Sequence, residues 1–516
     1  METKAKYHIP GWQWILATAV FFVAVLTLQQ YILFDIEQAR VFVYEGDRIM
    51  QQIKMAGGIA DCIALFLQQF FLFKVAAAAI MTALFILMSL CLDKVYASAA
   101  GRSTTTAEKF LCCLPAALLF VYTEGKILFI TGHVAIVISS VALLLGTCIV
   151  NWKKIAGYLL IPVLVLLTGF AVQTAVWPMI VALILYSLLY RKNYIAAGVT
   201  LLSAFLMVAL ARYLFLAMTS DELFSPDIYT YRLRTETIMP WVWGSIVVLA
   251  IIPFIFNKFV AEKINKHIAF AGVVLVAIVG MTSHFYKEYH DEVAVQRYAM
   301  QHWIDTGDYQ SAMDFSFNYI TNTYTANIYF MLLSQNSELE NEVGGVLQQG
   351  QQLIMAKSSI RLVRRHLMAL YYYLGYVNGA QREAFEYNEP SEGMMVPAAI
   401  KILAQTNIAQ GNYALAEKYL NYLDHTLFYS DWAQQYRKFL YKDKAVESDP
   451  ELGPRRKAAN IESVPQTWTT LAHVIRQIAF VAPELPATNY KKAFLRLGEY
   501  NKPSDYDNHQ QSFIQY

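Results

Sequence analysis

Four acidic side chains follow the first apolar run of the chain at close spacing. They are Asp35, Glu37, Glu45 and Asp47, in the stretch DIEQARVFVYEGD. A carboxylate at the edge of a membrane can take a proton from a hydroxyl group, or hold a divalent cation against a phosphate. We expect Asp35 to be the first catalytic candidate because it lies at the end of the apolar run, with Glu37 and Asp47 next. The alternative is that these acids lie in a solvated loop without a catalytic role. The sequence does not identify a cofactor, and a divalent cation is one candidate.

One cation interrupts a later apolar run. Arg212 lies in VALARYLFLAM, near the expected outer end of a membrane helix. A charge inside hydrocarbon costs about 2.5–3.5 kcal/mol on insertion scales unless it is paired or reaches the interface. Arg212 therefore either anchors the helix by extending towards the interface or binds the phosphate of a lipid, which a guanidinium matches well.

The elements that carry these residues are apolar helices. Hydrophobic residues make up 56% of the 516-residue chain and charged residues 16%, against roughly 25% charged in soluble domains. A membrane helix needs about 20 apolar residues. Uncharged runs of this kind cover 11–34, 75–92, 110–123, 127–150, 155–190, 194–217, 238–257 and 267–286. The run 155–190 is too long for one helix, and we expect a break between Gln173-Thr174 and Trp177-Pro178. The sequence predicts an all-α fold whose residues 1–286 form a polytopic bundle of about nine spans.

The distribution of Lys and Arg indicates an orientation. With the N-terminus inside, the expected cytoplasmic loops carry more basic residues than the opposite loops, although they are shorter. The positive-inside rule then places the N-terminus in the cytoplasm of a plasma (inner) membrane and everything after residue 287 on the extracytoplasmic (periplasmic) side.

The first outer loop, residues 35–74, has a second notable feature. After Gly57-Gly58 it continues as IADCIALFLQQFF, which is apolar but too short and polar to span, and which indicates a re-entrant or interfacial helix. One span, a large acidic loop and an amphipathic helix before the second span: this layout resembles the GT-C class of membrane glycosyltransferases. The resemblance implies a polyprenyl-phosphate-linked sugar donor at the outer face and an acidic first-loop residue acting as base or metal ligand. The chain has no strict DxD motif; Asp35-x-Glu37 and Glu45-x-Asp47 come nearest.

Two stretches are similar to an uncharacterised bacterial family of multi-pass membrane proteins that carries a domain of unknown function. They are GGIADCIALFLQQFF at 57–71 and LPATNYKKAF at 485–494. This resemblance implies the architecture and leaves the activity open.

Residues 287–516 change character. HWIDTGDYQSAMDF (302–315) and NIAQGNYALAEKYL (407–420) share G-x-Y-x-x-A, which resembles the middle of a tetratricopeptide repeat. We expect a soluble TPR-like array of stacked helix pairs, with its tyrosines and small residues in the core. The polar segment 441–465 is expected to be a loop. Such an array would bind envelope proteins or glycans.

Other chemistry is not indicated. The formal net charge of +2 excludes a typical nucleic-acid binder. His284, His290 and His302 have no zinc-motif spacing, and we assign no metal ligands. We expect Glu124 to be solvated in a tight turn, and His133 to form a hydrogen bond between helices. The sequence therefore leaves two functions open. The protein is either a GT-C-like glycosyltransferase or a non-enzymatic, membrane-anchored helical-repeat scaffold.

Overall fold

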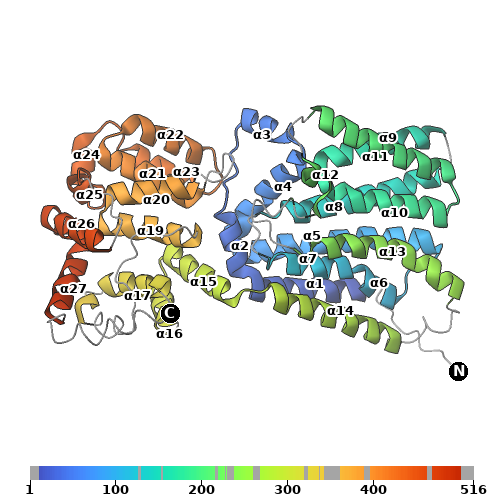
Figure 1. Cartoon of the computed structure of the whole chain (residues 1–516), viewed down its shortest axis with the longest axis horizontal. Coiled ribbons are helices and arrows are strands. Elements are labelled where there is room, and N and C mark those ends of the chain that lie inside the picture. Colours follow the sequence, from blue (N-terminus) through green and yellow to red (C-terminus); the bar gives the residue numbers. More distant parts are fainter. Residues whose placement is uncertain are drawn as a thin grey trace, which may run out of the picture. The chain divides into compact units, whose positions relative to one another are not determined.

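A computed structural model describes residues 11–125, 129–152, 155–214, 219–226, 228, 237–259, 268–318, 323–335, 338–341, 361–388, 396–461 and 468–500. Within these ranges the regular structure is helical, without strands, which confirms the predicted all-α class. The chain divides into two compact units (Figure 1). Unit 1 comprises Met1–Glu37 and Glu45–Glu292, and unit 2 comprises Gln38–Tyr44 and Val293–Tyr516.

Unit 1 is a bundle of apolar helices. In chain order they are α1 (Trp12–Ala24), the π-helical turn η1 (Val25–Gln29), α2 (Gln30–Glu37), α3 (Gly46–Ile53), α4 (Gly58–Gln68), the 3₁₀ turn η2 (Gln69–Leu72), α5 (Lys74–Ala100), α6 (Thr106–Cys112), α7 (Leu114–Tyr122), α8 (Thr131–Asn151), α9 (Ile155–Val172), the 3₁₀ turn η3 (Gln173–Ala175), α10 (Val176–Leu189), α11 (Tyr194–Leu214), α12 (Ser220–Phe224), α13 (Met239–Phe259) and α14 (Ile268–Tyr289).

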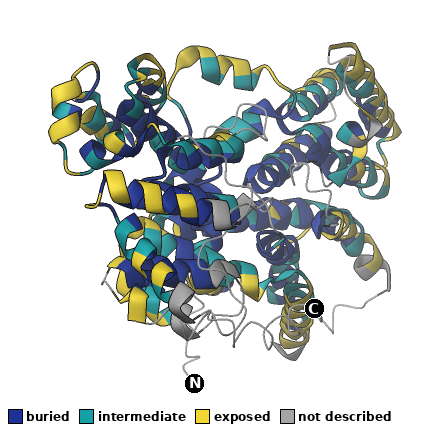
Figure 2. Ribbon diagram, turned by 60° about the vertical axis from the view of Figure 1, so that its left-hand side comes forward, coloured by how far each residue is buried: buried dark blue, intermediate teal, exposed yellow. Residues whose placement is uncertain are grey.

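Length and composition make this unit a membrane domain. Five helical stretches in the described part of the chain are long and apolar enough to cross a bilayer: Trp12–Glu37, Lys74–Ala100, Thr131–Asn151, Ile155–Leu189, which contains the turn η3, and Tyr194–Leu214. The other predicted spans fall on the shorter pair α6–α7 and on α13 and α14. Large apolar side chains on the outward faces of these helices are exposed, as a hydrocarbon solvent allows (Figure 2). The protein is therefore an integral membrane protein.

The predicted break in the run 155–190 is confirmed. α9 ends at Val172, η3 follows, and α10 begins at Val176. Gln173 has φ 51°, a left-handed conformation that a non-glycine residue adopts only when its surroundings impose it. Pro178 lies near the start of α10, where its missing N–H costs no intrahelical hydrogen bond.

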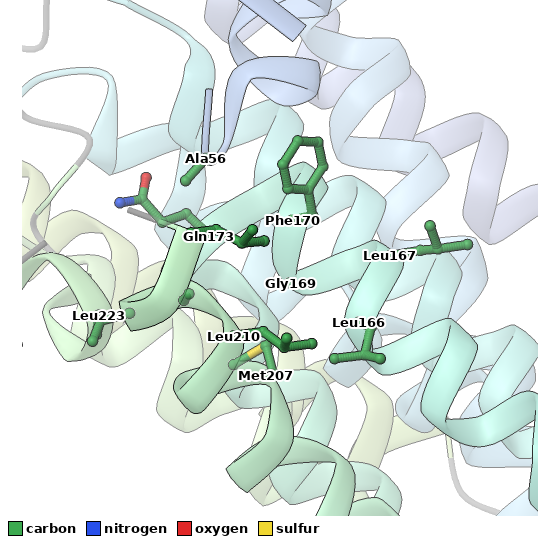
Figure 3. A pocket seen from close by; sticks show the side chains of 11 residues that line it. Ala56, Leu166, Leu167, Gly169, Phe170, Gln173, Met207, Leu210 and Leu223 are labelled. Atoms are coloured by element: carbon green, nitrogen blue, oxygen red, sulfur yellow. The ribbon is translucent and has the colours of Figure 1, made fainter. Parts of the chain in front are cut away.

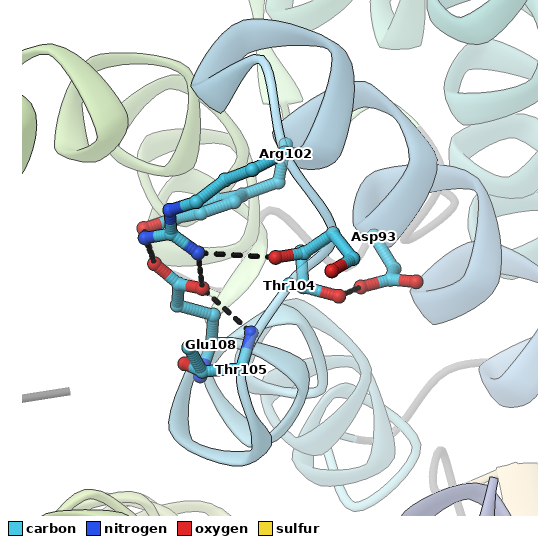
Figure 4. Close-up of polar contacts among 7 residues, drawn as sticks. Asp93, Arg102, Thr104, Thr105 and Glu108 are labelled. Atoms are coloured by element: carbon cyan, nitrogen blue, oxygen red, sulfur yellow. Dashed lines mark hydrogen bonds and ion pairs between the residues drawn. The ribbon is translucent and has the colours of Figure 1, made fainter. Parts of the chain in front are cut away.

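A capping box begins the short helix α6 at the opposite end of unit 1 (Figure 4). The Thr105 hydroxyl accepts from the Glu108 N–H, and the Glu108 carboxylate accepts from the Thr105 N–H at 2.7 Å. Arg102 donates two hydrogen bonds to the same carboxylate, at 2.9 and 2.7 Å, and the Tyr96 hydroxyl donates a further one at 3.1 Å. Burial raises the pKa of Glu108, but the hydrogen bonds from Arg102 and Thr105 outweigh it and hold the pKa below its usual value.

The apolar helix after Gly57-Gly58 packs inside the bundle along one face. α4 contacts α3, α8 and α9. Gly57 has φ 74°, and a Cβ at Gly58 would lie 1.8 Å from the Gln52 carbonyl oxygen, so glycine is required for the tight turn between α3 and α4. Ile63 and Phe66 remain exposed on the other face. α4 is therefore a half-buried apolar helix, and its placement as a re-entrant or interfacial segment stays a prediction.

Unit 2 is an array of shorter amphipathic helices. They are α15 (Glu292–Thr306), α16 (Tyr309–Asn318), α17 (Thr323–Gln335), α19 (Arg361–Leu374), α20 (Val377–Asn388), α21 (Pro397–Gln410), α22 (Tyr413–Asp424), α23 (Ser430–Arg437), α24 (Asp443–Ser448), α25 (Leu452–Ala458), α26 (Trp468–Val481) and α27 (Ala487–Tyr500). Most helices that follow one another in the chain also pack against one another, as α19 does with α20, α20 with α21, and α21 with α22.

Three of these pairs turn at a glycine. Gly307, Gly375 and Gly411 have φ of 77°, 87° and 78° and end the first helix of α15–α16, α19–α20 and α21–α22. Two of them belong to the shared G-x-Y-x-x-A sequences, whose alanines, Ala312 and Ala416, are fully buried. The expected core position of the tyrosine is wrong for Tyr309, which is 42% exposed.

Packing decides the structure of two further sequences in this half, and the loop predicted for the first of them is wrong. The segment 441–465, expected to be a loop, contains α24 and α25, whose Val446 and Leu452 are fully buried. In LPATNYKKAF, the side chains of Leu485, Tyr490 and Phe494 belong to the main core of the unit. These three residues of the sequence therefore stabilise unit 2 by packing.

Part of the first outer loop belongs to unit 2. Gln38–Tyr44 leaves α2 and packs on this unit, burying Ala39, Val41 and Phe42. The Gln38 amide donates to the Tyr429 hydroxyl at 2.8 Å, and the Tyr44 N–H donates to the His425 carbonyl oxygen at 2.7 Å. We call Gln38–Tyr44 the strap.

Candidate functional site

The first two predicted catalytic carboxylates are buried in unit 1. Asp35 is 9% exposed and Glu37 is 2% exposed, both in the last turn of α2. Residues two apart on a helix project about 200° from each other, so the two carboxylates leave the helix on different sides. Burial of a carboxylate costs free energy unless it is hydrogen-bonded or paired, and both residues do make polar or electrostatic interactions.

The third predicted acid lies in a different environment. Asp47 is exposed in the first turn of α3, where an acidic side chain stabilises the positive end of the helix dipole. Its neighbour Glu45 pairs with Arg48 at 2.5 Å, and both side chains are well exposed. Asp47 is therefore a surface acid, whereas Asp35 and Glu37 are buried carboxylates.

The predicted phosphate-binding cation lies at a helix end. Arg212 is in the last turn of α11 and is exposed. It directly follows Ala211, which lines an apolar pocket between α9 and α11 (Figure 3). In the tyrosine- and arginine-rich loop that follows, residues 218–237, the structure describes 219–226, 228 and 237.

A buried carboxylate–imidazole pair is the feature that sequence reasoning missed. Glu124 is 4% exposed rather than solvated, which corrects the expectation for this residue. One of its carboxylate oxygens lies 2.7 Å from His290 Nδ1, and the other accepts from Gln29 Nε2 at 2.9 Å. Burial raises the pKa of the Glu124 carboxyl, partly countered by the hydrogen bonds from His290 and Gln29.

Three elements position this pair. Glu124 follows the end of α7, His290 follows the end of α14, and Gln29 is the last residue of the π-helical turn η1. The Gln29 amide also donates to the Phe120 carbonyl oxygen at 2.8 Å, and the His290 ring stacks on Tyr286 at 4.6 Å between centroids. Isolated π-helical turns inside α-helices are frequent at functional sites. No sequence motif joins these residues. The available signal is that Glu124 and His290 each lie in a polar stretch directly after an apolar run.

Asp61 and His133 make further polar contacts in unit 1. Asp61, in the first turn of α4, accepts from the Thr131 hydroxyl at 2.8 Å and also from the Gln52 amide. His133 Nε2 lies 3.0 Å from the Thr123 hydroxyl and 3.2 Å from the Leu119 carbonyl oxygen. The His133 contacts join α8 to the end of α7, which is the hydrogen bonding between helices predicted for His133, and the Asp61–Thr131 hydrogen bond joins α4 to α8.

The chain direction shows that these groups share one end of the bundle. α2, α7, α9, α11 and α14 all finish at this end, whereas α4, α5, α8, α10 and α13 begin there (Figure 1). Buried carboxylates and an imidazole can move protons and hold a hydroxyl group. Among the described residues no three His, Cys, Asp or Glu side chains are arranged to hold a metal ion.

The helices and this polar end define a multi-pass integral membrane protein with buried ionisable groups at one end of its helix bundle. The chain belongs to DUF6057, a family of unknown function, whose model matches residues 6–486. No curated protein and no solved structure matches the chain.

Proposed function

We propose that this protein is a GT-C-like glycosyltransferase that takes a sugar from a polyprenyl-phosphate donor at the extracytoplasmic face of the plasma membrane. The single observation that carries the proposal is the burial of Asp35 and Glu37 at the end of the first span. Ionisable groups at membrane depth are costly and are usually retained for function. Glu124 and His290, at the same end of unit 1, add further proton-carrying groups.

The chemistry needs one base and one leaving group. A carboxylate of Asp35 or Glu37 takes the proton from an acceptor hydroxyl, whose oxygen then bonds to C1 of the sugar. The bond between C1 and the phosphate oxygen breaks, and its electron pair leaves with the polyprenyl phosphate. A divalent cation, if the enzyme uses one, would neutralise charge on the phosphate. Arg212 is the proposed protein-borne cation for the same phosphate.

The test uses conservative replacements in the full chain. Asp35→Asn and Glu37→Gln remove the base while keeping side-chain size, and loss of a general base typically reduces the rate about 10²–10⁴-fold. Glu45→Gln is the matched control, because Glu45 lies in the same loop but is exposed and paired with Arg48. Asp47→Asn asks whether the exposed acid takes part as well.

Sugar transfer from a polyprenyl-phosphate donor is measured in membranes, and the envelope glycan is analysed in cells. We expect at least one of the two buried-acid variants to lose transfer while inserting and melting normally. Full transfer and a normal glycan in both Asp35→Asn and Glu37→Gln would rule out this enzyme.

A second candidate function is a membrane-anchored scaffold that uses a TPR-like unit 2 to bind envelope proteins or glycans. The helix pairs with left-handed glycine turns favour it, and Phe480, which is 81% exposed on α26, offers an accessible position at which to test it. Under this alternative, Phe480→Asp abolishes the cellular phenotype while Asp35→Asn and Glu37→Gln leave it unchanged. The enzyme hypothesis predicts the reverse.

A further inference from the structure

The carboxylate–imidazole pair of Glu124 and His290 has one closed end and one open end. The Glu124 side chain is fully buried, whereas that of His290 is 23% exposed. Glu124 Oε2 lies 2.7 Å from His290 Nδ1. Within the described part of the chain, His290 Nε2 makes no hydrogen bond and is not buried. A substrate can therefore approach the pair at Nε2.

The contact with Glu124 decides which ring nitrogen of His290 carries the proton. A carboxylate only accepts hydrogen bonds, so Nδ1 donates and the neutral ring has its lone pair on Nε2. In Ser-His-Asp triads the buried carboxylate does the same. It holds the imidazole in the tautomer that can accept a proton, and it stabilises the imidazolium that forms.

Gln29 and two aromatic rings hold the pair in this arrangement. Gln29 Nε2 donates to Glu124 Oε1 at 2.9 Å and to the Phe120 carbonyl oxygen at 2.8 Å. Gln29 Oε1 is buried and has no hydrogen bond to any described residue. A buried acceptor without a partner is costly, so the amide gives up one hydrogen bond while it donates to Glu124. The His290 ring stacks on Tyr286, which itself stacks on Phe120.

We propose that His290 is a general base for the hydroxyl group of a substrate, with Glu124 and Gln29 as positioning residues. The O–H bond breaks as its proton moves to Nε2, and the electron pair stays on the oxygen, which becomes a nucleophile. Glu124 stabilises the imidazolium, and the exposed ring then returns the proton to water. This inference goes beyond the proposed function, because neither Asp35 nor Glu37 takes part and the test needs no sugar donor.

Glu124→Gln separates this role from packing. The new amide has the size of the carboxylate and can still bond both neighbours. Because Gln29 Nε2 only donates, the amide presents its oxygen to Gln29 and its NH₂ group to His290. His290 Nδ1 then has to accept, the ring proton moves to Nε2, and the lone pair that acts as the base is lost. The corresponding Asp→Asn change in a serine protease triad leaves the geometry intact and gives the wrong tautomer.

The experiment measures the reactivity of Nε2 directly. The full-length protein in detergent is treated at about pH 8 with diethyl pyrocarbonate, which modifies a ring nitrogen that has a free lone pair, and the modified peptides are quantified by mass spectrometry. His425 is the internal control. It is exposed, and its Nδ1 lies 2.8 Å from the Asn421 carbonyl oxygen, so its tautomer is fixed in the same way without a carboxylate. Thermal melting checks that each variant is folded.

We expect His290 to react in the wild type and its rate to fall about tenfold or more in Glu124→Gln, whereas His425 reacts equally in both proteins. An unreactive His290 beside a reactive His425 in the wild type would overturn the proposal, because Nε2 would then be covered or protonated. An unchanged rate for His290 in Glu124→Gln would overturn the positioning role of Glu124.

The catalytic role is tested in cells that lack the protein. Glu124→Gln and His290→Gln should fail to restore the normal phenotype, and the matched control His425→Gln should restore it. Normal restoration by either of the first two variants would overturn the general base and leave the pair with a structural role. Sugar transfer is not measured in either experiment, so failure of the glycosyltransferase proposal would not affect their interpretation.

Discussion

The buried pair of Glu124 and His290 offers the sharpest test of the structure. We consider Glu124→Met, His290→Phe and the double variant. Methionine has a similar size without the carboxylate, and phenylalanine keeps the stacking on Tyr286 while it removes Nδ1. A hydrogen bond to a charged group contributes about 1.5–3 kcal/mol when buried. The Glu124 side chain is fully buried and that of His290 is 23% exposed, so we expect a coupling free energy of about 2 kcal/mol.

That coupling corresponds to a roughly 30-fold change in the unfolding equilibrium. Each single variant should cost more than the coupling alone, because it leaves the other polar group buried without this partner. The double variant should then be about 2 kcal/mol more stable than the sum of the two single effects predicts.

The cysteines supply a reporter for unit 1 alone. All five are free and lie in this unit, and Cys91, Cys112 and Cys113 are buried. Cys148 is exposed and Cys62 is half-buried, so both are replaced by serine in every variant. A dye that fluoresces on reaction with the three buried thiols then reports the unfolding of unit 1 in detergent, with temperature or denaturant as the variable. The control combines His290→Phe with Ser98→Ala, at the far end of the bundle, whose effects should add within about 0.5 kcal/mol. Additive effects of Glu124→Met and His290→Phe would refute the pairing.

Three further outcomes follow from individual contacts. The pKa of Glu108 is lowered in the folded state, so its ionised form stabilises the fold. The difference in stability between wild type and Glu108→Gln should therefore be greatest at pH 7 and decline below about pH 4.5, which thermal scans at several pH values measure. Gly375→Ala should cost about 1–3 kcal/mol, measured by denaturant unfolding, because φ is 87° and a Cβ would lie 2.3 Å from Leu485 Cδ1. Gln38→Ala should lower the free energy of local opening around Tyr429, measured by hydrogen exchange, by roughly 1 kcal/mol. Unchanged exchange there would contradict the strap contact.

Much of the fold follows from local properties of the sequence. Uncharged runs of about 20 residues locate the membrane helices because an apolar bilayer leaves the backbone no other way to satisfy its hydrogen bonds. The break at Gln173 was predictable from the polar residues and the proline inside an overlong run. In unit 2, the shared motif predicted pairs of helices, and its glycines, Gly307 and Gly411, end the first helix of two pairs because glycine adopts a left-handed conformation without steric cost.

The predictions that failed concern residues whose setting depends on distant partners. Glu124 was assigned to solvent because it lies in a short turn, but His290 stands 166 positions away in the sequence and approaches it only through the packing of α7 and α14. Tyr309 was placed in the core by analogy with a repeat, yet its side chain is exposed. The segment 441–465 looked like a loop because its helices are short and polar, and tertiary burial of Val446 and Leu452 decides otherwise.

Asp35, Glu37 and Asp47 show which properties follow from the sequence alone and which depend on the tertiary structure. The sequence by itself determined that Asp35, Glu37 and Asp47 follow a membrane span, since hydropathy and charge are properties of neighbouring residues. Only the tertiary structure decided that Asp35 and Glu37 are buried and Asp47 is exposed, and that the intervening strap packs on unit 2. Burial is a property of the whole chain, because the atoms that exclude water from a side chain come from helices far away in sequence.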